Sequence, residues 1–242
     1  MTFKRLEDRL PEEGYEDYID IVDDLRDPTK TVFRYLLDMV TSIESVDLKR
    51  EYTVFGGYAV LTHLIAQYGD KIVKLWRGSS DIDVAGSVNV LNLLKSFYNV
   101  ESDFISPNIV DKRTVKLRIP DEDLCKIDFT LDEDQGSYQR EEKYILGIPI
   151  NVAGPYALIK HKLIPAQDET NHCIDIIKLL GILEYRKDSI ENLTNNLDPN
   201  ERKILREVII ETRGKASNKR MTAEPSDSYL SQLKSELRKR SY

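Results

Sequence analysis

The sequence predicts an α/β (α+β) domain over residues 1–153 and a helical domain over residues 154–242. Short apolar segments with the alternation of half-buried strands lie among helical segments as far as residue 153. From Gly154 onward helical spacing continues and the strand pattern disappears. The 242 residues allow one large domain or two small ones, and a hydrophobic content of 40% is sufficient for a core.

The chain opens with an acidic segment, residues 1–27, which we expect to lie along the surface or to fray. Asp27-Pro28 indicates a helix start, because proline is favoured at the first helical position. The helix that follows has apolar residues at spacings of three and four, and these form its predicted core face: Val32, Phe33, Leu36, Leu37, Val40 and Ile43.

Short strands and helices alternate in the middle of the first domain. A strand at Tyr52–Phe55 ends at Gly56-Gly57, and a helix follows the glycines. Further strands are expected at Ile72–Trp76 and Ile82–Ala85, with an amphipathic helix at Val88–Phe97. Two later strands are indicated by apolar residues at every second position: Val115, Leu117 and Ile119, and then Ile127, Phe129 and Leu131.

The pattern changes around the predicted domain boundary. Ile145–Val152 reads as a strand interrupted by Gly147, which indicates a hairpin or a bulge. Beyond it, helical spacing predicts four helices: Pro155–Leu163, His172–Tyr185, Pro199–Thr212 and Ser226–Arg240.

Charge is distributed unevenly along the chain. The formal net charge of -7 argues against a surface that binds nucleic acid everywhere. Residues 213–242 form a basic tail, which is either a contact for a polyanion or a solvated helix with a flexible basic linker. The tail begins with four cations that could make such a contact: Arg213, Lys215, Lys219 and Arg220.

Cysteine usage and hydropathy exclude several classes of protein. Cys125 and Cys173 are far apart, share no metal-type spacing and lie in apolar segments, so buried thiols are predicted. No apolar segment follows Lys4 and Arg5, so no signal peptide is expected. No apolar run reaches the about 18 residues of a membrane span, and we expect a cytoplasmic location.

Two carboxylates carry the chemistry that the sequence indicates. Residues two apart on a strand share a face, so Asp81 and Asp83 project together while Ile82 points to the core. Paired carboxylates repel each other, and a divalent cation relieves the repulsion. Oxygen ligands of this kind suit Mg²⁺ or Mn²⁺. An Asp-x-Asp pair alone is weak evidence, because two solvated acids give the same pattern.

An anion site is predicted beside this pair. Gly56-Gly57 between a strand and a helix places backbone amides at a helix start, where they can hold a phosphate. Arg77 and the hydroxyls of Ser79 and Ser80, just before the acids, add phosphate donors.

A third acid is expected on a neighbouring strand, for two-metal chemistry. Asp128 is the candidate, because its neighbours Ile127 and Phe129 point into the core and leave it on the opposite face. Four other acids lie nearby at expected strand ends: Asp121, Asp123, Asp132 and Asp134.

The pattern of Gly-Gly, a helix of about twenty residues, Arg-x-Ser-x-Asp-Ile-Asp and a later strand Asp resembles the nucleotidyltransferase superfamily (the polymerase-beta-like fold). It is most similar to the AbiEii-like toxins and the antibiotic nucleotidyltransferases. The resemblance implies a small mixed sheet flanked by helices, with two Mg²⁺ ions, replaceable by Mn²⁺, bound by Asp81, Asp83 and Asp128. It also implies a triphosphate held on Gly56 and Gly57.

The sequence departs from this family at two places, directly after Gly-Gly and in a downstream segment. Many members have Ser or Thr directly after Gly-Gly, where this chain has Tyr58. AbiEii-like proteins also tend to have a helical lysine, a role that we assign to Lys160 for nucleotide binding. Of their downstream Lys-Asp-x-x-Asp segment only Asp175 is present.

The expected activity is transfer of a nucleoside monophosphate from an NTP such as ATP to a hydroxyl acceptor, with release of pyrophosphate. An AbiEii-like relationship implies RNA, such as a tRNA end, as acceptor and an antitoxin protein as partner. An antibiotic-type relationship implies a small hydroxylated molecule, and a protein hydroxyl is a third option. The rival hypotheses are a non-catalytic nucleotide-binding module and a metal-dependent phosphate hydrolase.

Several other residues have simpler interpretations than catalysis. His63 is expected to be a partly buried helical histidine rather than a catalytic base, and Trp76 a core residue rather than a platform for a base. His161 and His172 are eleven positions apart, without the spacing of a zinc site.

Overall fold

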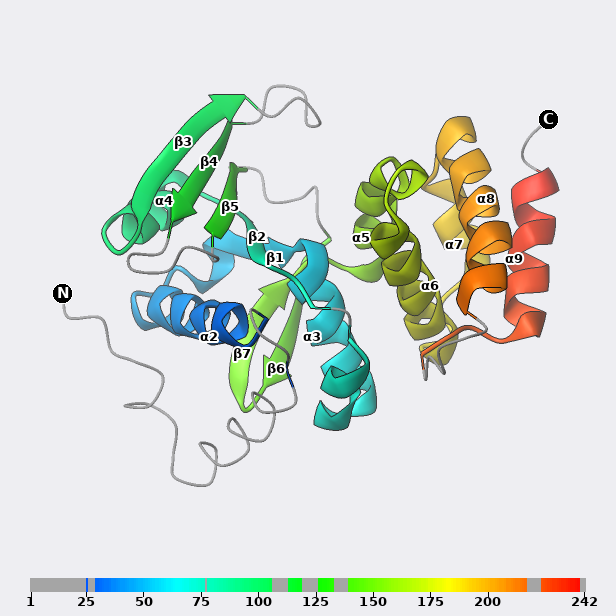
Figure 1. Ribbon diagram of the computed structural model, residues 1–242, viewed down its shortest axis with the longest axis horizontal. Coiled ribbons are helices and arrows are strands. Elements are labelled where there is room, and N and C mark those ends of the chain that lie inside the picture. Colours follow the sequence, from blue (N-terminus) through cyan, green and yellow to red (C-terminus); the bar gives the residue numbers. More distant parts are fainter. Residues whose placement is uncertain are drawn as a thin grey trace. The chain divides into compact units, whose positions relative to one another are not determined.

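A computed structural model of the chain describes residues 25, 29–76, 78–105, 113–118, 126–132, 139–216 and 223–239. The chain divides into two compact units, Met1–Ala153 and Gly154–Tyr242. Figure 1 shows strands and helices in the first unit and helices in the second.

The first unit is built on a seven-stranded mixed sheet (Figure 1). Its strand order is β3-β4-β5-β2-β1-β7-β6. Strand β2 runs parallel to β5, and β1 parallel to β7, whereas the other neighbours are antiparallel. The strands are β1 (Tyr52–Phe55), β2 (Asp81–Gly86), β3 (Asn99–Ile105), β4 (Arg113–Arg118), β5 (Lys126–Leu131), β6 (Glu141–Ile145) and β7 (Ile148–Val152).

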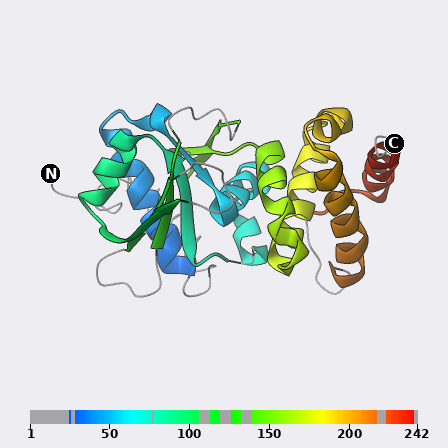
Figure 2. The same cartoon turned by 90° about the horizontal axis from the view of Figure 1, so that it is seen from above.

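Helices α2 (Thr29–Ser45), α3 (Gly56–Tyr68) and α4 (Val88–Lys95) pack on this sheet, and α2 and α4 lie side by side in Figure 2. Short 3₁₀ segments cover Lys49–Glu51 and Asp70–Leu75. The predicted core face of α2 is confirmed, because all six of its apolar residues are fully buried. The central strands bury their apolar residues on one face of the sheet: Ile82, Val84, Ile127 and Phe129.

The second unit contains, among its described residues, helices and no strand. The helices are α5 (Pro155–Leu163), α6 (Thr170–Tyr185), α7 (Ile190–Asn195), α8 (Pro199–Ala216) and α9 (Asp227–Lys239), with a 3₁₀ turn at Pro165–Gln167. Helix α6 packs against α5 and α8, and α9 packs against α7 and α8. At Gly181 of α6 a Cβ atom would lie 2.9 Å from the carbonyl carbon of Ala223, so the chain entering α9 crosses α6 at a glycine.

A buried ion pair joins α5 to α6. The ammonium of Lys162 lies 2.9 Å from Oδ2 of Asp175, and both side chains are almost completely buried. A buried charge is tolerated only with a partner, so these two residues depend on each other.

The predicted fold class is confirmed: a mixed sheet flanked by helices precedes a helical region. Strand Tyr52–Phe55 and helix Pro155–Leu163 have the predicted bounds. The hairpin alternative for Ile145–Val152 is the one observed, because Leu146 and Gly147 both have positive φ and connect β6 to β7 in a two-residue turn.

Some predicted elements were wrong or missing. The strand expected at Ile72–Trp76 is the 3₁₀ segment, because its buried residues Ile72, Val73 and Trp76 have helical spacing. The helix after the glycines has 13 residues rather than about twenty, since Gly69 ends it with a φ of 78°. Strand β3 and helix α7 were not predicted; β3 is polar, and a register shift between Val100 and Ser102 interrupts its alternation.

Other predictions lie outside the described residues, namely the acidic segment before Leu25, the helix start at Asp27-Pro28 and strand residue Ile119. Among the residues that the structure describes, no helix is long and apolar enough to cross a membrane.

Candidate functional site

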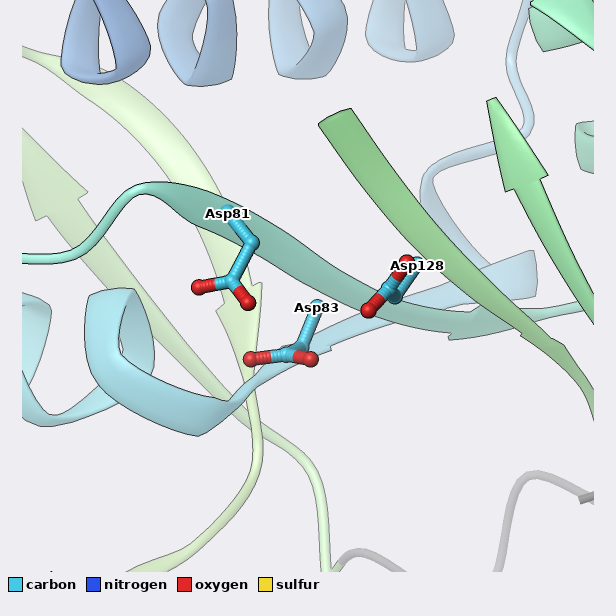
Figure 3. Close-up of side chains that lie close together, drawn as sticks. All are labelled: Asp81, Asp83 and Asp128. Atoms are coloured by element: carbon cyan, nitrogen blue, oxygen red, sulfur yellow. The ribbon is translucent and has the colours of Figure 1, made fainter. Parts of the chain in front are cut away.

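The three predicted acids lie together on one face of the sheet. Asp83 and Asp128 are direct register partners in the parallel pair of β2 and β5, and Asp81 is two residues earlier on β2. Each of the three carboxylates offers an oxygen, and these oxygens all lie within 4.8 Å of one another. In Figure 3 the carboxylates project from two neighbouring strands on the same side. The structure therefore brings together the acids that the sequence selected.

Strand alternation produces this arrangement. Ile82, Ile127 and Phe129 are fully buried on the other face, so the acids between them must point away from the core. Because β2 and β5 are parallel and in register, Asp128 is level with Asp83.

The carboxylate of Asp128 lies in surroundings that disfavour its charge. Burial raises the pKa of Asp128, and the charge of Asp81 raises it further. Lys126 and Lys116 act in the opposite direction and lower this pKa, with Nζ of Lys126 3.9 Å from Oδ2 of Asp128. Among the described residues, none hydrogen-bonds Oδ1 of Asp128, although this atom is buried.

These residues fit a divalent cation. An unpaired buried carboxylate oxygen is costly, and a cation would satisfy it. The donor set consists of carboxylate oxygens only, which is the ligand chemistry of Mg²⁺ and Mn²⁺ rather than of softer metals.

The glycine turn lies against the acid pair. Gly56 has a φ of 68° and directly follows Phe55, the register partner of Asp83. A Cβ atom on Gly56 would lie 2.7 Å from Cγ of Asp83 and closer still to Oδ2. Only glycine fits here, on grounds of both backbone conformation and space.

Helix α3 begins at these glycines, as predicted. Phe55 at its N-cap makes no side-chain capping hydrogen bond. The first-turn amides of Gly56 and Gly57, which the predicted phosphate site requires, are therefore next to Asp83.

The segment before β2 contacts the same acids. Oγ of Ser79 donates a hydrogen bond to Oδ1 of Asp81 at 2.9 Å. Ser80 is exposed and directly precedes Asp81. Arg77, the third predicted phosphate donor of this segment, lies outside the described residues.

Tyr58 has a structural role that the sequence did not indicate. Its ring is fully buried between Phe33 and Trp76, with centroid separations of 6.3 Å and 5.0 Å. Its hydroxyl lies 3.2 Å from the carbonyl oxygens of both Thr29 and Ser79. Tyr58 thus holds the segment that carries Ser79 in place.

Trp76 is a core residue, as predicted, whereas His63 is fully rather than partly buried. His63 is fully buried on α3, with Nε2 2.8 Å from the carbonyl oxygen of Ala153. Trp76 is buried beside Tyr58. Cys173 is also buried, as predicted, and its Sγ lies 3.2 Å from the carbonyl oxygen of Ala166.

Two of the predicted residues of the second unit have partners there. Lys160 is largely exposed on α5, with Nζ 3.4 Å from the carbonyl oxygen of Asn196 and 3.6 Å from Oε2 of Glu201. The lysine that pairs with Asp175 is Lys162. A nucleotide contact by Lys160 stays a prediction.

Among the other acids that the sequence offers near Asp128, the structure describes Asp132. Asp132 is buried beyond the end of β5, and its backbone amide donates to the carbonyl of Gly86. The other candidates lie outside the described residues or have side chains outside them: Asp121, Asp123, Asp134, Cys125, Arg213, Lys215, Lys219 and Arg220.

The mixed sheet, the glycine turn and the three acids agree with the nucleotidyltransferase fold that the resemblance implies. No protein-family model and no curated protein matches the chain. In structure it is similar to the antibiotic-resistance factor ANT(2'')-Ia in solution, with a TM-score of 0.42 and 15% identity, over 76% of this chain and 96% of that one.

Two further solved structures are similar. ANT(2'')-Ia in complex with adenylyl-2''-tobramycin has a TM-score of 0.41 and 13% identity, over 86% of this chain and 99% of that one. An antigenic nucleotidyltransferase-like protein from Paracoccidioides brasiliensis has a TM-score of 0.43 and 14% identity, over 84% and 95%. Because these values are low, the function of this chain has to be inferred from its own residues.

Proposed function

We propose that this chain is a divalent-metal-dependent nucleotidyltransferase that transfers a nucleoside monophosphate from an NTP to a hydroxyl acceptor. One observation carries the proposal. Three carboxylates from two strands converge within 4.8 Å, directly beside a glycine turn that opens a helix. A structural ion pair or a solvated acid would not require this convergence.

Each part of the site has a role in this proposal. Asp81, Asp83 and Asp128 would hold the metal ions, with Mg²⁺ as the expected ion. When bound, such ions would supply charge neutralisation at the triphosphate and would lower the pKa of the acceptor hydroxyl. The amides of Gly56 and Gly57 and the hydroxyls of Ser79 and Ser80 hold the phosphates, assisted by Arg77.

The chemical step balances with these groups. The acceptor oxygen forms a bond to the α-phosphorus, the bond from that phosphorus to the bridging oxygen breaks, and pyrophosphate leaves. Asp128 would take the acceptor proton. Catalysis then consists mainly of positioning and charge neutralisation by preformed groups.

The test is the variant Asp83→Asn, which keeps the shape of the side chain and removes its charge. Pyrophosphate release should fall by about 100-fold or more, as for loss of one electrostatic partner of a transition state. Asp47→Asn is the matched control, because it makes the same substitution at an exposed residue. Asp47 has a φ of 59°, which Asn also adopts. Undiminished turnover in Asp83→Asn would refute the assignment.

The same assay separates the rival functions. ATP, CTP, GTP and UTP are each tested with Mg²⁺, with total RNA or an aminated sugar as acceptor. Metal-dependent thermal stabilisation without any pyrophosphate indicates a non-catalytic binding module. Release of inorganic phosphate indicates a hydrolase. Transfer of the nucleoside monophosphate to the aminated sugar indicates an antibiotic-type acceptor.

A further inference from the structure

A cavity of the second unit contains none of the residues that we assign to the catalytic site. Its volume is about 570 Å³, within the range of about 300–1,000 Å³ that is typical of small-molecule sites. Its wall comes from the end of α6, the turn that follows it, the start of α7 and one face of α9. Helices α7 and α9 pack against each other, so the cavity belongs to one compact unit.

The cavity is elongated along α9. The residues of α9 that line it include Tyr229, Gln232, Glu236 and Lys239, which recur at spacings of three and four and therefore share one face of the helix. At a rise of about 1.5 Å per residue, this strip is about 15 Å long. A linear molecule fits such a strip better than a compact one does.

The wall of the cavity is negatively charged. Four carboxylates and two ammonium groups line it: those of Glu184, Asp188, Glu191 and Glu236, and those of Lys187 and Lys239. Nζ of Lys239 lies 2.6 Å from Oε1 of Glu236, so these two charges neutralise each other. Three carboxylates and one ammonium group remain, and the cavity therefore favours a cation.

The hydroxyl of Tyr229 is buried and has no hydrogen-bond partner among the residues that the structure describes. The side chain lines the cavity and is only 8% exposed. Burial raises the pKa of this hydroxyl, and the charges of Tyr156, Glu184 and Asp188 raise it further. Glu184 and Asp188 line the same cavity, so a neutral hydroxyl lies within electrostatic reach of the acidic wall. A bound hydrogen-bond donor would satisfy its oxygen.

The wall is preformed where α6 meets α9. The carboxylate of Glu184 accepts a hydrogen bond from the backbone amide of Ser226 at 2.6 Å and another from its hydroxyl. The amide of Tyr229 in turn donates to Oγ of Ser226 at 3.1 Å. Because these bonds hold the wall in place, a ligand would bind without the cost of ordering it.

The carboxylates of the cavity do not converge on one point. Among the described residues, the acids, histidines or cysteines that could surround a metal ion in a group of three or more are Asp81, Asp83 and Asp128. None of the described acids of the cavity belongs to such a group. Separated carboxylates suit a ligand whose positive charges are also separated, rather than a single metal ion.

We propose that this cavity binds a linear polyamine, with one ammonium group between the hydroxyl of Tyr229 and the carboxylate of Asp188 and a second beside Glu191. An ammonium group has three donors and no acceptor, so a hydroxyl oxygen and carboxylates satisfy it. Methylene segments separate the charges of a polyamine, as the carboxylates of the wall are separated. The proposal is independent of nucleotidyl transfer, because the catalytic site lies in other residues.

The test is calorimetric titration of spermidine into the full chain, with a chelator and without NTP. The wild type should show saturable binding at one site. Tyr229→Phe keeps the ring and should weaken spermidine binding by roughly three- to tenfold, as for loss of one hydrogen bond to a charged group. The Tm of the ligand-free variant should not fall, because no described residue loses a hydrogen bond. A lower Tm with unchanged affinity would make the hydroxyl structural and overturn the proposal.

A pair of matched variants separates the cavity from general attraction to an acidic chain. Asp188→Asn keeps the shape of a lining side chain and should weaken spermidine binding by roughly three- to tenfold. Asp168→Asn makes the same change at an exposed residue of the same unit that does not line the cavity, and affinity should stay at the wild-type value. Equal losses in the two variants contradict a defined site.

Asp83→Asn separates this cavity from the catalytic site, because it should keep the wild-type affinity for spermidine. Loss of spermidine binding in this variant would place the polyamine among the catalytic acids and overturn the inference alone. Binding that depends on Tyr229, with no pyrophosphate from any NTP, would refute only the proposed function. Tighter binding of a lysine tripeptide with the same dependence on Tyr229 would assign the cavity to a basic peptide and overturn the assignment to a polyamine.

Discussion

Asp128 lies in surroundings that disfavour its own charge. Burial raises its pKa, the charge of Asp81 adds to this effect, and one carboxylate oxygen has no hydrogen-bond partner among the described residues. The lysines nearby compensate only in part. Such a residue reduces the stability of the metal-free chain, which is a common consequence of building a functional site.

Asp128→Asn should therefore stabilise the metal-free protein while abolishing nucleotidyl transfer. We expect the Tm in the presence of a chelator to rise by about 2–4 °C, which corresponds to about 1 kcal/mol in a chain of this length. Differential scanning fluorimetry with and without Mg²⁺ measures both effects. A metal-free Tm below that of the wild type would contradict this interpretation of Asp128.

The difference in Tm between the wild type and Asp128→Asn should depend on pH, and its direction follows from the pKa of Asp128. The folded-state pKa of Asp128 is raised above its ordinary value of 3.8. The stabilisation by the protonated carboxyl is thus complete below that value and is lost as the pH rises through the folded-state pKa. The Tm advantage of Asp128→Asn should grow from low pH to neutral pH, measured without metal.

Gly56→Ala should damage the acid cluster as well as the backbone. The new Cβ would displace the carboxylate of Asp83, and the positive φ costs about 1–3 kcal/mol in addition. Gly69→Ala is the matched control: Gly69 has a φ of 78° at the other end of α3, but a Cβ there meets nothing within 4 Å. Both variants should lose stability, whereas only Gly56→Ala should lose Mg²⁺-dependent stabilisation by NTP, as measured by thermal shift.

At the scale of elements, Tyr58 holds three segments in place. It belongs to α3, and its hydroxyl lies close to a carbonyl at the start of α2 and to another just before β2. The orientation of the Ser79 segment toward Asp81 therefore depends on a side chain that is itself buried away from the acids.

Tyr58→Phe should keep the ring packing and remove the hydroxyl. We expect a loss of about 1 kcal/mol in the free energy of unfolding, the usual net value of one hydrogen bond. KM for NTP should rise more than kcat falls, because the Ser79 segment is loosened while the acids stay in place. Steady-state pyrophosphate release and urea unfolding check the two parts. Unchanged KM would show that Ser79 needs no support from Tyr58.

The sequence predicted those elements whose patterns are local. Strand alternation was enough to place Asp128 on the face of Asp81 and Asp83, because alternation alone decides the face. The strand prediction for Ile72–Trp76 was wrong, because a short apolar run fits either period, and this run overlaps the 3₁₀ segment Asp70–Leu75. The role of Tyr58 was not predictable, since it depends on contacts between residues more than twenty positions apart.

At the scale of the whole molecule, the acids and the glycine turn belong to one unit, and the buried pair of Lys162 with Asp175 to the other. The stability of the second unit rests on its own core, in which this pair joins α5 to α6. Burial of two charges is favourable only while both are present.

Asp175→Asn should cost about 3–5 kcal/mol in the free energy of unfolding, because it leaves the ammonium of Lys162 buried without its partner. The double variant Lys162→Met/Asp175→Leu should recover most of this loss. Urea unfolding followed by circular dichroism measures both. If the double variant is destabilised as much as Asp175→Asn, the pair contributes more to stability than the mutual neutralisation of two buried charges.

Asp83 and Asp128 are register partners in the pairing of β2 with β5, and this register determines which side chains stand beside the acids. Whether a β5 side chain meets the acids or the core depends only on whether its position is odd or even. A shift of β5 by one residue against β2 would bury the carboxylate of Asp128 and place Ile127 or Phe129 beside Asp83.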